Sequence, residues 1–213
     1  MKATEERYKY PRTPHLPWSR GTADDKTLKN DDHFKGKRVI VTLKMDGECT
    51  SIYSDYFHAR SLDSESHPSQ NWVRKLQGDI GWMIPSGIRI CGENLYAKHT
   101  VEYTDLTSFF TGFSLWNGDL CYDWETTSDT FDVLDIQPVP VIYDDVYNMM
   151  AIQAVWGKYS SAHEGYVVRI AEQFNYADFD TSVAKFVKPE FREALNQNTK
   201  HWKQGVYTKN KLK

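Results

Sequence analysis

Residues 38–48 of the chain read RVIVTLKMDGE, and this stretch decides the fold. Residues 39–43 within it are β-branched or apolar, which predicts a strand over residues 38–44, and the Asp-Gly pair is a turn signal. Strand character resumes over residues 49–54, so we expect a hairpin or meander over residues 38–60. Lys44 ends the first strand, where its amine would be rigidly placed. The plain alternative is an ordinary hairpin with this lysine in solvent.

Outward from this stretch, strands and helices follow without regular alternation. The patterns predict strands at 87–96, 109–116, 165–170 and 182–188, a turn at 117–118, and helices at 69–84, 126–136, 145–156 and 190–197. A doubly wound parallel sheet needs a regular strand–helix rhythm, which is missing here. We therefore predict the α+β class.

The charges are balanced overall but segregated along the chain. The 213 residues include 26 Lys and Arg against 29 Asp and Glu, a net charge of −3, which argues against a generic basic coat for nucleic acid. No Lys or Arg lies between Lys98 and Lys158, whereas five lysines and no acid lie between Lys200 and Lys213. We expect one positive face, although a solvated end is the simplest interpretation of the last segment.

Several classes of protein are disfavoured by composition. No apolar run approaches the roughly 20 residues of a membrane helix, and the charged N-terminal stretch lacks the apolar region of a signal peptide. The 3 cysteines are far apart and form no CxxC pair, which disfavours a disulfide framework and a structural zinc site. We predict a reduced, cytoplasmic compartment.

Three later segments carry further charged residues within strand patterns. Glu93 lies in the apolar stretch ICGENL, where a carboxylate is costly to bury without partners. Glu164 opens the stretch EGYVVR, and Lys185 and Lys188 lie in AKFVKP. The latter two stretches are, by themselves, also typical of ordinary edge strands.

Taken in order, these segments resemble the covalent nucleotidyltransferase superfamily of ATP-dependent polynucleotide ligases and mRNA capping enzymes. KMDG at 44–47 matches the KxDG motif, GE at 92–93 the third motif, and EGYVVR at 164–169 the EGxVxR motif. AKFVK at 184–188 and the His-Trp pair at 201–202 look most like ATP-dependent RNA ligases. The family often spaces its last lysines as KxK, whereas this chain has KxxK.

The resemblance implies a fold and a set of site residues. The fold is a nucleotidyltransferase domain, ATP-grasp-like, of mixed antiparallel sheets with flanking helices and no appended oligonucleotide-binding barrel. We expect an arm over 1–37, this domain over 38–200 and a basic tail over 201–213. The implied catalytic residues are Lys44, Lys185 and Lys188; the nucleotide-binding residues are Asp46, Gly47, Arg60, Glu93, Phe113, Glu164, Lys185 and Lys188; and the metal ligands are Glu93 and Glu164.

The implied activity is the joining of RNA 3′-OH and 5′-phosphate ends through a lysyl-AMP, with ATP and Mg²⁺ as cofactors. A free lysine amine is protonated at pH 7, so we expect Lys185, Lys188 and Mg²⁺ to lower the pKa of Lys44. RNA would follow the positive face toward the lysine-rich tail. Whether a partner protein assists RNA binding stays open.

Two alternative functions remain. A capping guanylyltransferase or a DNA ligase usually carries a barrel after the last lysine motif, but only 25 residues follow Lys188. A catalytically silent RNA-binding module is disfavoured because Lys44, Glu93, Glu164 and Lys185 are all intact. The arm stretch TPHLPWS at 13–19 is more simply a packed extended segment than a contact to substrate.

Overall fold

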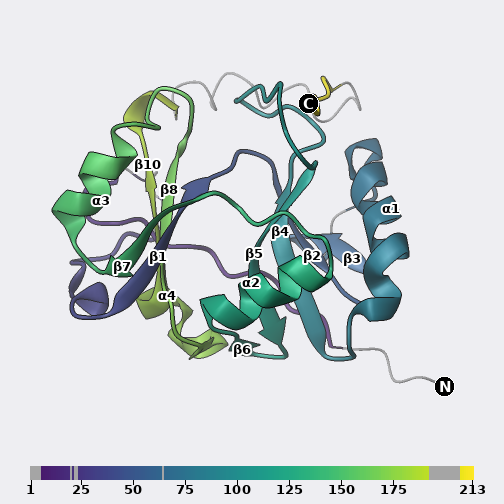
Figure 1. Cartoon of the computed structure of the whole chain (residues 1–213), viewed down its shortest axis with the longest axis horizontal. Coiled ribbons are helices and arrows are strands. Elements are labelled where there is room, and N and C mark those ends of the chain that lie inside the picture. The colour runs from purple at the N-terminus through teal and green to yellow at the C-terminus, as the bar shows by residue number, and fades with distance from the viewer. Residues whose placement is uncertain (1–5, 20, 22–23, 64, 192–206) are drawn as a thin grey trace.

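The computed structural model of the chain describes residues 6–19, 21, 24–63, 65–191 and 207–213. Over these ranges the strands form two antiparallel sheets, which occupy the two halves of the molecule (Figure 1). The predicted α+β class of mixed antiparallel sheets with flanking helices is confirmed. None of the helices in these ranges is long and apolar enough to cross a membrane.

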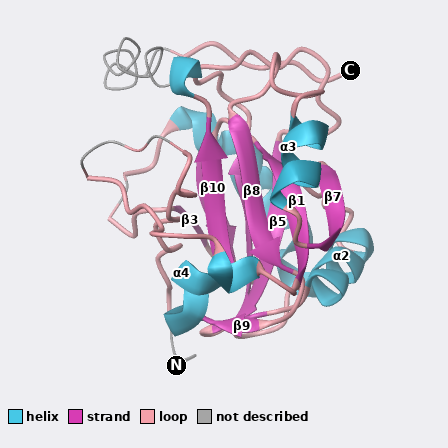
Figure 2. Cartoon of the chain, turned by 90° about the vertical axis from the view of Figure 1, so that its left-hand side faces the viewer, coloured by secondary structure: helices cyan, strands magenta, loops and turns pink. Residues whose placement is uncertain are grey.

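The first sheet, called sheet A, has the order β10–β8–β1–β7 (Figure 2). Its strands are β1 (Arg38–Lys44), β7 (Val141–Val146), β8 (Gly165–Ile170) and β10 (Val183–Val187). Five consecutive residues of β1 are buried, which agrees with its continuous apolar sequence. This central strand ends at Lys44 and so fixes the position of that lysine.

The second sheet, called sheet B, has the order β3–β2–β4–β5–β6–β9. Its strands are β2 (Glu48–Ile52), β3 (Phe57–Ala59), β4 (Ile88–Asn94), β5 (Phe110–Asn117), β6 (Leu120–Cys121) and β9 (Phe174–Asn175). A large apolar cluster includes residues of both sheets, such as Val41 of β1 and the fully buried Trp116 of β5.

Helices pack against both sheets, and α1 covers the outer face of sheet B (Figure 1). They are α1 (Asn71–Ile80), α2 (Trp124–Val133), α3 (Met149–Trp156) and α4 (Phe179–Ser182), with 3₁₀ turns at Asp32–Phe34, Pro68–Gln70, Gly81–Met83 and Tyr176–Asp178. The apolar spacing of α1 buries Val73 and Ile80 in one cluster with Ile52 and Ile90 of sheet B.

The Asp-Gly turn after β1 does not close a hairpin, contrary to the sequence prediction. β1 pairs with β7 and β8, whereas β2 pairs with β3 and β4, so the turn carries the chain from sheet A to sheet B. Close packing at Gly47 explains this path: a Cβ there would lie 2.4 Å from the carbonyl oxygen of Asn94 in β4. The turn therefore joins the two sheets at the position of Lys44.

The segment between residues 124 and 156 differs from the prediction in two places. α2 begins earlier than predicted because Asp123 accepts a hydrogen bond from the Thr126 amide, and it ends before Asp135, which has a φ of 52°. The strand β7 was missed, since its acidic residues are unusual in strands. They are tolerated at this sheet edge, where Asp144 pairs with Arg38 of β1.

Two segments outside the predicted domain pack closely against it. Residues 14–19 lie along the outer edge of β10, where the backbones of Pro14 and Leu16 hydrogen-bond to the backbone of Lys185. Residues 207–213 pack against the loop at 95–106. The solvated end that we expected is thus wrong for residues 207–213, while most of the predicted helix at 190–197 lies outside the described residues.

Candidate active site

Lys44 meets a carboxylate because of the register between β1 and β8. Lys44 pairs with Gly165, so Glu164 lies at the end of the neighbouring strand, and its Oε2 is 2.7 Å from the Lys44 Nζ. Only a glycine fits at position 165, because a Cβ would lie 1.9 Å from the carbonyl oxygen of Phe186. Two predicted residues, 120 positions apart in sequence, are thereby brought into one ion pair.

Glu93 reaches the same place from sheet B. It lies in β4, and its Oε1 accepts a hydrogen bond of 3.1 Å from the amide of Gly47. The glycine of the predicted motif thus holds a carboxylate through its backbone, while its missing side chain lets β4 approach. Lys44 is therefore flanked by one glutamate from each sheet.

Asp46 does not line the cavity beside Lys44, although the sequence analysis assigned it to nucleotide binding. Its side chain is buried, and its Oδ2 accepts hydrogen bonds of 2.7 Å from both the Thr100 and the Val101 amides. Its own amide donates to the Tyr103 hydroxyl. Asp46 therefore holds the loop at 95–106 against the turn that follows Lys44.

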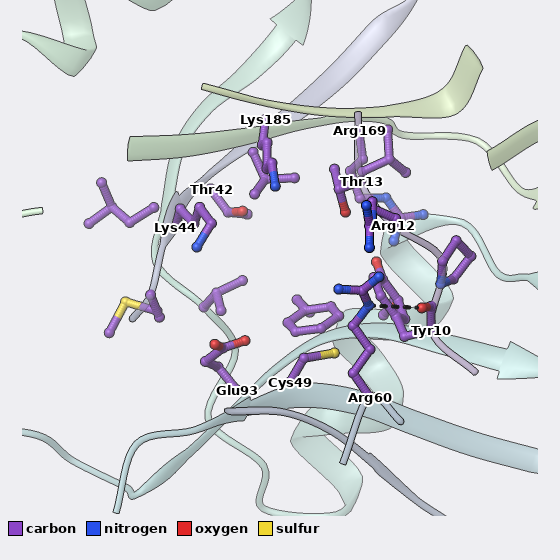
Figure 3. Close-up of a pocket in the computed structure, with 18 of the residues that line it drawn as sticks. Tyr10, Arg12, Thr13, Thr42, Lys44, Cys49, Arg60, Glu93, Arg169 and Lys185 are labelled. Atoms are coloured by element: carbon purple, nitrogen blue, oxygen red, sulfur yellow. Dashed lines mark hydrogen bonds between the residues drawn. The ribbon is translucent and has the colours of Figure 1, made fainter. Parts of the chain in front are cut away.

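A cavity lies between the two sheets, and predicted residues enter it from both sides (Figure 3). Sheet A contributes Lys44 and Lys185, and sheet B contributes Glu93 and Phe113. Arg60 follows β3 and also faces the cavity. The structure thus gathers five of the predicted site residues around one space.

The third wall of the cavity comes from the arm, which the sequence analysis had not assigned to the site. Tyr10, Pro11, Arg12 and Thr13 line the cavity (Figure 3). The Tyr10 ring contacts the Phe113 ring edge-on at 5.2 Å, and the Tyr10 carbonyl accepts a long hydrogen bond from Arg60. No local motif marks this role, because the arm is brought here by its pairing with β10, a long-range contact.

Arg169 is a further cavity residue that could have been found from the sequence. It ends the EGYVVR motif and shares a strand face with Val167, which also lines the cavity. Its Nη2 donates to the Tyr122 carbonyl and its Nε to the Ile170 carbonyl. Its Nη1 is buried and has no hydrogen-bond partner of ordinary geometry in the described part of the chain, although the guanidinium also acts on the neighbouring Cys121 thiol.

The two predicted C-terminal lysines have different surroundings. Lys185 is held within β10 and lines the cavity. Lys188 follows the strand, does not line the cavity, and donates to the Ser160 carbonyl at 2.7 Å. The KxxK spacing therefore directs only the first lysine toward Lys44. The His-Trp pair at 201–202 lies outside the described residues.

The ionisable groups of the cavity perturb one another strongly. Burial raises the pKa of Glu93 to about 8, although the charge of Lys44 acts in the opposite direction. Burial also raises the pKa of Glu164. Burial and the charge of Lys44 lower the pKa of Lys185 to about 8. Perturbations of this kind are typical of functional sites, although buried ion pairs also produce them.

The groups of the chain by themselves shift the pKa of Lys44 in the direction opposite to that expected with Lys185, Lys188 and Mg²⁺ acting together. Burial lowers this pKa, but the carboxylates of Glu164 and Glu93 together outweigh burial, and the pKa is raised. Lys185 acts on Lys44 less strongly than these two carboxylates do. Without nucleotide, Lys44 is therefore a paired ammonium group, and its proton must leave before it can act as a nucleophile.

The two glutamates suit a metal that arrives with a nucleotide. No group of three or more His, Cys, Asp or Glu able to hold a metal occurs in the described ranges. Mg²⁺ is commonly bound by one or two carboxylates, with phosphate oxygens and waters completing its shell. Glu93 and Glu164 supply that number of hard oxygen ligands beside Lys44, so the residues present fit this mode of binding.

A model of the RNA ligase family matches residues 37–187, which includes the motif residues from Lys44 to Lys185. The match covers more than half of the chain. The chain belongs to the RNA ligase family. This membership explains why glutamates and lysines so far apart in sequence are gathered around one cavity.

Solved RNA ligases share the fold of this family member. An archaeal ATP-dependent RNA ligase gives a TM-score of 0.61 at 16% identity, over 90% of this chain and 52% of that chain. A Naegleria gruberi RNA ligase with PPi gives 0.57 at 15% identity, over 91% and 64%. A mutant of the Naegleria gruberi ligase with ATP and Mn gives 0.54 at 15% identity, over 78% and 53%.

These likenesses concern the fold, since the identities are low. This RNA ligase family chain spans about half to just under two thirds of the length of those ligases. Among curated proteins, no sequence matches it significantly.

Proposed function

We propose that this chain is the adenylylating domain of an ATP-dependent RNA ligase that joins 3′-OH and 5′-phosphate ends through a lysyl-AMP. One observation carries the proposal: Lys44 ends a rigid strand at a cavity, with Glu164 2.7 Å from its amine and Lys185 on the neighbouring wall. Family membership and the ATP and PPi bound by the Naegleria gruberi ligases support it.

The nucleotide is expected to lie between the two sheets. Phe113 offers its ring face to the base, and stacking of this kind contributes about 1–3 kcal/mol. Arg169 lines the same cavity and would place its guanidinium near the nucleotide. Arg12, Arg60 and Lys185 supply positive charge for the phosphates.

The first step forms the covalent intermediate. The Lys44 ammonium loses a proton, for which Glu164 is the adjacent acceptor. The free amine attacks the α-phosphorus, a P–N bond forms, and the bond to pyrophosphate breaks. The bonded nitrogen then loses a second proton to solvent, which leaves a neutral P–NH linkage. Lys185 offsets the charge that develops on the phosphates. A Mg²⁺ held by Glu93 and Glu164 would neutralise further phosphate charge when bound.

The later steps transfer the nucleotide and seal the ends. The 5′-phosphate of an RNA attacks the adenylate, an anhydride forms, and the P–N bond breaks with return of two protons to the Lys44 nitrogen. A 3′-OH then attacks the 5′-phosphate, AMP leaves, and the hydroxyl proton is lost. This returns Lys44 to the state seen here.

The test is adduct formation with labelled nucleotide. The protein is incubated with Mg²⁺ and α-labelled ATP, or separately GTP, and run on a denaturing gel. Label from ATP that is absent in Lys44→Ala supports adenylylation, and sealing of a nicked RNA substrate is then measured. Label from GTP alone indicates a capping guanylyltransferase, and sealing of DNA alone indicates a DNA ligase. RNA binding without label from either nucleotide indicates the silent binding module.

RNA contact is proposed along the basic residues near the cavity and the segment 207–213. Lys209 lies over the Tyr96 ring at 5.0 Å, a pairing that suits both a phosphate and a base. RNA affinity should fall as salt rises, because each phosphate contact releases counterions. An affinity that does not change between low and moderate salt would refute this path.

A further inference from the structure

Residues 207–213 form a close backbone-bonded layer on the loop at 95–106. The Lys98 amide donates to the Thr208 carbonyl, and the Asn210 amide donates to the Tyr96 carbonyl. The contact continues farther along, where Leu106 exchanges hydrogen bonds with Lys211 and Lys213. This pairing fixes the segment along the loop rather than at a single point.

Asn210 is the one buried polar side chain of this segment, with an exposed fraction of 3%. Its Nδ2 donates to the Leu95 carbonyl at 2.8 Å, and more weakly to the Ala97 carbonyl at 3.4 Å. Its Oδ1 accepts from the Tyr103 amide at 2.9 Å. One side chain therefore ties together the two ends of the loop.

The opposite side of the same loop holds Asp46. The Thr100 and Val101 amides both donate to its carboxylate at 2.7 Å, and the Tyr103 hydroxyl accepts from its amide. Tyr103 thus contacts Asn210 through its backbone and Asp46 through its side chain. Only Met45 separates Asp46 from Lys44 along the chain.

We infer that Asn210 is a positioning residue for Lys44: it fixes the loop at 95–106, and the loop fixes Asp46 and the turn after β1. Asn210 does not line the cavity, so its effect must be transmitted through the loop. The inference rests on the proposed adenylylation for its functional consequence. The geometric part of the inference, that Asn210 holds the loop whose amides bind Asp46, does not depend on the proposed adenylylation.

The geometric part is tested by hydrogen exchange on the whole chain. In Asn210→Ala, exchange of the Thr100 and Val101 amides should become at least about tenfold faster, because the loop opens more often. Lys213→Ala is the matched control: its side chain is exposed on the same segment, and exchange should stay as in the wild type. Unchanged exchange in Asn210→Ala would overturn the inference.

The functional part is tested by separating nucleotide binding from adduct formation. Asn210→Ala should form adduct at least about tenfold more slowly at saturating ATP, with the Kd for ATP within about twofold of the wild type. Asp46→Ala should show the same split. The double variant should be no slower than the slower single variant, since both changes release the same turn.

Other outcomes lead to distinct conclusions. Rate losses that multiply in the double variant would overturn the inference, as would a lowered unfolding midpoint with normal exchange and a normal rate. If Asn210→Ala does not fold, Asn210→Asp is used. It keeps the acceptor for Tyr103 and replaces the donating Nδ2 with an oxygen that faces the Leu95 carbonyl, so it breaks the same tie and also adds a charge. If the wild type forms no adduct but the Thr100 and Val101 amides still exchange faster in Asn210→Ala, the proposed function is wrong. The conclusion that Asn210 fixes the loop at 95–106 is then kept.

Discussion

The inner face of β4 carries two buried charged centres that are built in opposite ways. Glu93, near one end of the strand, faces Lys44 across the cavity. Arg89, four residues earlier and on the same face, is about 13 Å away along the strand. Arg89 is 1% exposed, and its guanidinium lies 4.8 Å and 4.7 Å from the ring centroids of Tyr8 and Trp116.

The two centres differ in what compensates the charge. Lys44 is paired with Glu164 and influenced by Glu93, so its charge depends on the protonation of its neighbours. Among the described residues, the three guanidinium nitrogens of Arg89 have no hydrogen-bond partner of ordinary geometry, and aromatic faces surround the cation instead. A proton can therefore move at the first centre, whereas the second keeps a fixed charge. We expect chemistry at the first and only packing at the second.

The largest expected effect is the complete loss of adduct formation when Lys44, at the first centre, is replaced. Lys44→Ala should give no labelled adduct, because the attacking amine is gone, and the protein should stay folded. Loss of the amine leaves Glu164 buried, and that carboxylate will take up a proton rather than remain an unpaired anion. Adduct formation is measured on a denaturing gel and folding by circular dichroism. A Lys44→Ala protein that still accepts label would remove the distinction between the centres.

The next effect concerns the second cation of the cavity. The pKa of Lys185 is lowered to about 8 by burial and by Lys44, so this lysine loses its charge as the pH rises through about 8. ATP affinity should fall over that range. Lys185→Gln should bind ATP about 10–100-fold more weakly at pH 7 and without this pH dependence.

Lys188→Gln is the matched control for this experiment. Its amine contacts the Ser160 carbonyl outside the cavity, so the pH dependence of ATP binding should persist in this variant. Titration calorimetry between pH 7 and 9 measures both variants. An equal loss of the pH dependence in Lys188→Gln would place that lysine at the nucleotide as well.

A third prediction concerns the stability contributed by Glu93. Its pKa is raised to about 8 in the folded chain from 4.5, so the folded state binds more protons than the unfolded state between these pH values. Stability contributed by the protonated group is present below about pH 4.5 and is lost as the pH rises toward 8. This group alone lowers the unfolding free energy by up to about 1.4 kcal/mol per pH unit.

Glu93→Gln should remove this component from the pH dependence. Urea unfolding at several pH values measures the slope, with Glu125→Gln, an exposed carboxylate, as the control. If the slope is the same in Glu93→Gln and the wild type, Glu93 is ionised over the whole range in the folded state.

The smallest effect is expected at the second centre. Arg89→Met keeps an unbranched apolar stem and removes a buried charge that has no carboxylate partner among the described residues. The unfolding free energy should therefore change by less than about 1 kcal/mol. Adduct formation should be normal. Arg89→Ala, which leaves a cavity between the rings, should lose about 3 kcal/mol. A loss of that size in Arg89→Met would mean that the cation–ring contacts are themselves stabilising.

The fold was predictable where the pattern of side chains is local. The central strand at 38–44 and the helix before β4 follow from apolar spacing alone, and the structure has both. The strand β7 was missed because its partner, Arg38 of β1, lies about a hundred residues earlier and compensates its acidic residues. The path of the Asp-Gly turn likewise depends on Asn94, which no local pattern connects to Gly47.

The site was predictable where a motif names the residue. Lys44, Glu93, Phe113 and Lys185 came from motif order and lie on the cavity. The arm residues Tyr10 to Thr13 did not, because long-range contacts bring them there, among them the pairing of Pro14 and Leu16 with β10. The spacing of Lys185 and Lys188 also did not predict that the Lys188 side chain contacts the Ser160 carbonyl. β10 ends at Val187, between the two lysines, so they do not follow the alternation of one strand.

The pairing of the arm with β10 also affects when the cavity can form. Pro14 and Leu16 bond to Lys185, so the wall formed by residues 10–13 lacks this part of its support until β10 has been synthesised. At the roughly 5–20 residues per second of translation, the first residues of the arm wait on the order of ten seconds or more for their partner. A ribosome stalled before β10 therefore displays a chain in which the cavity between the two sheets lacks one side.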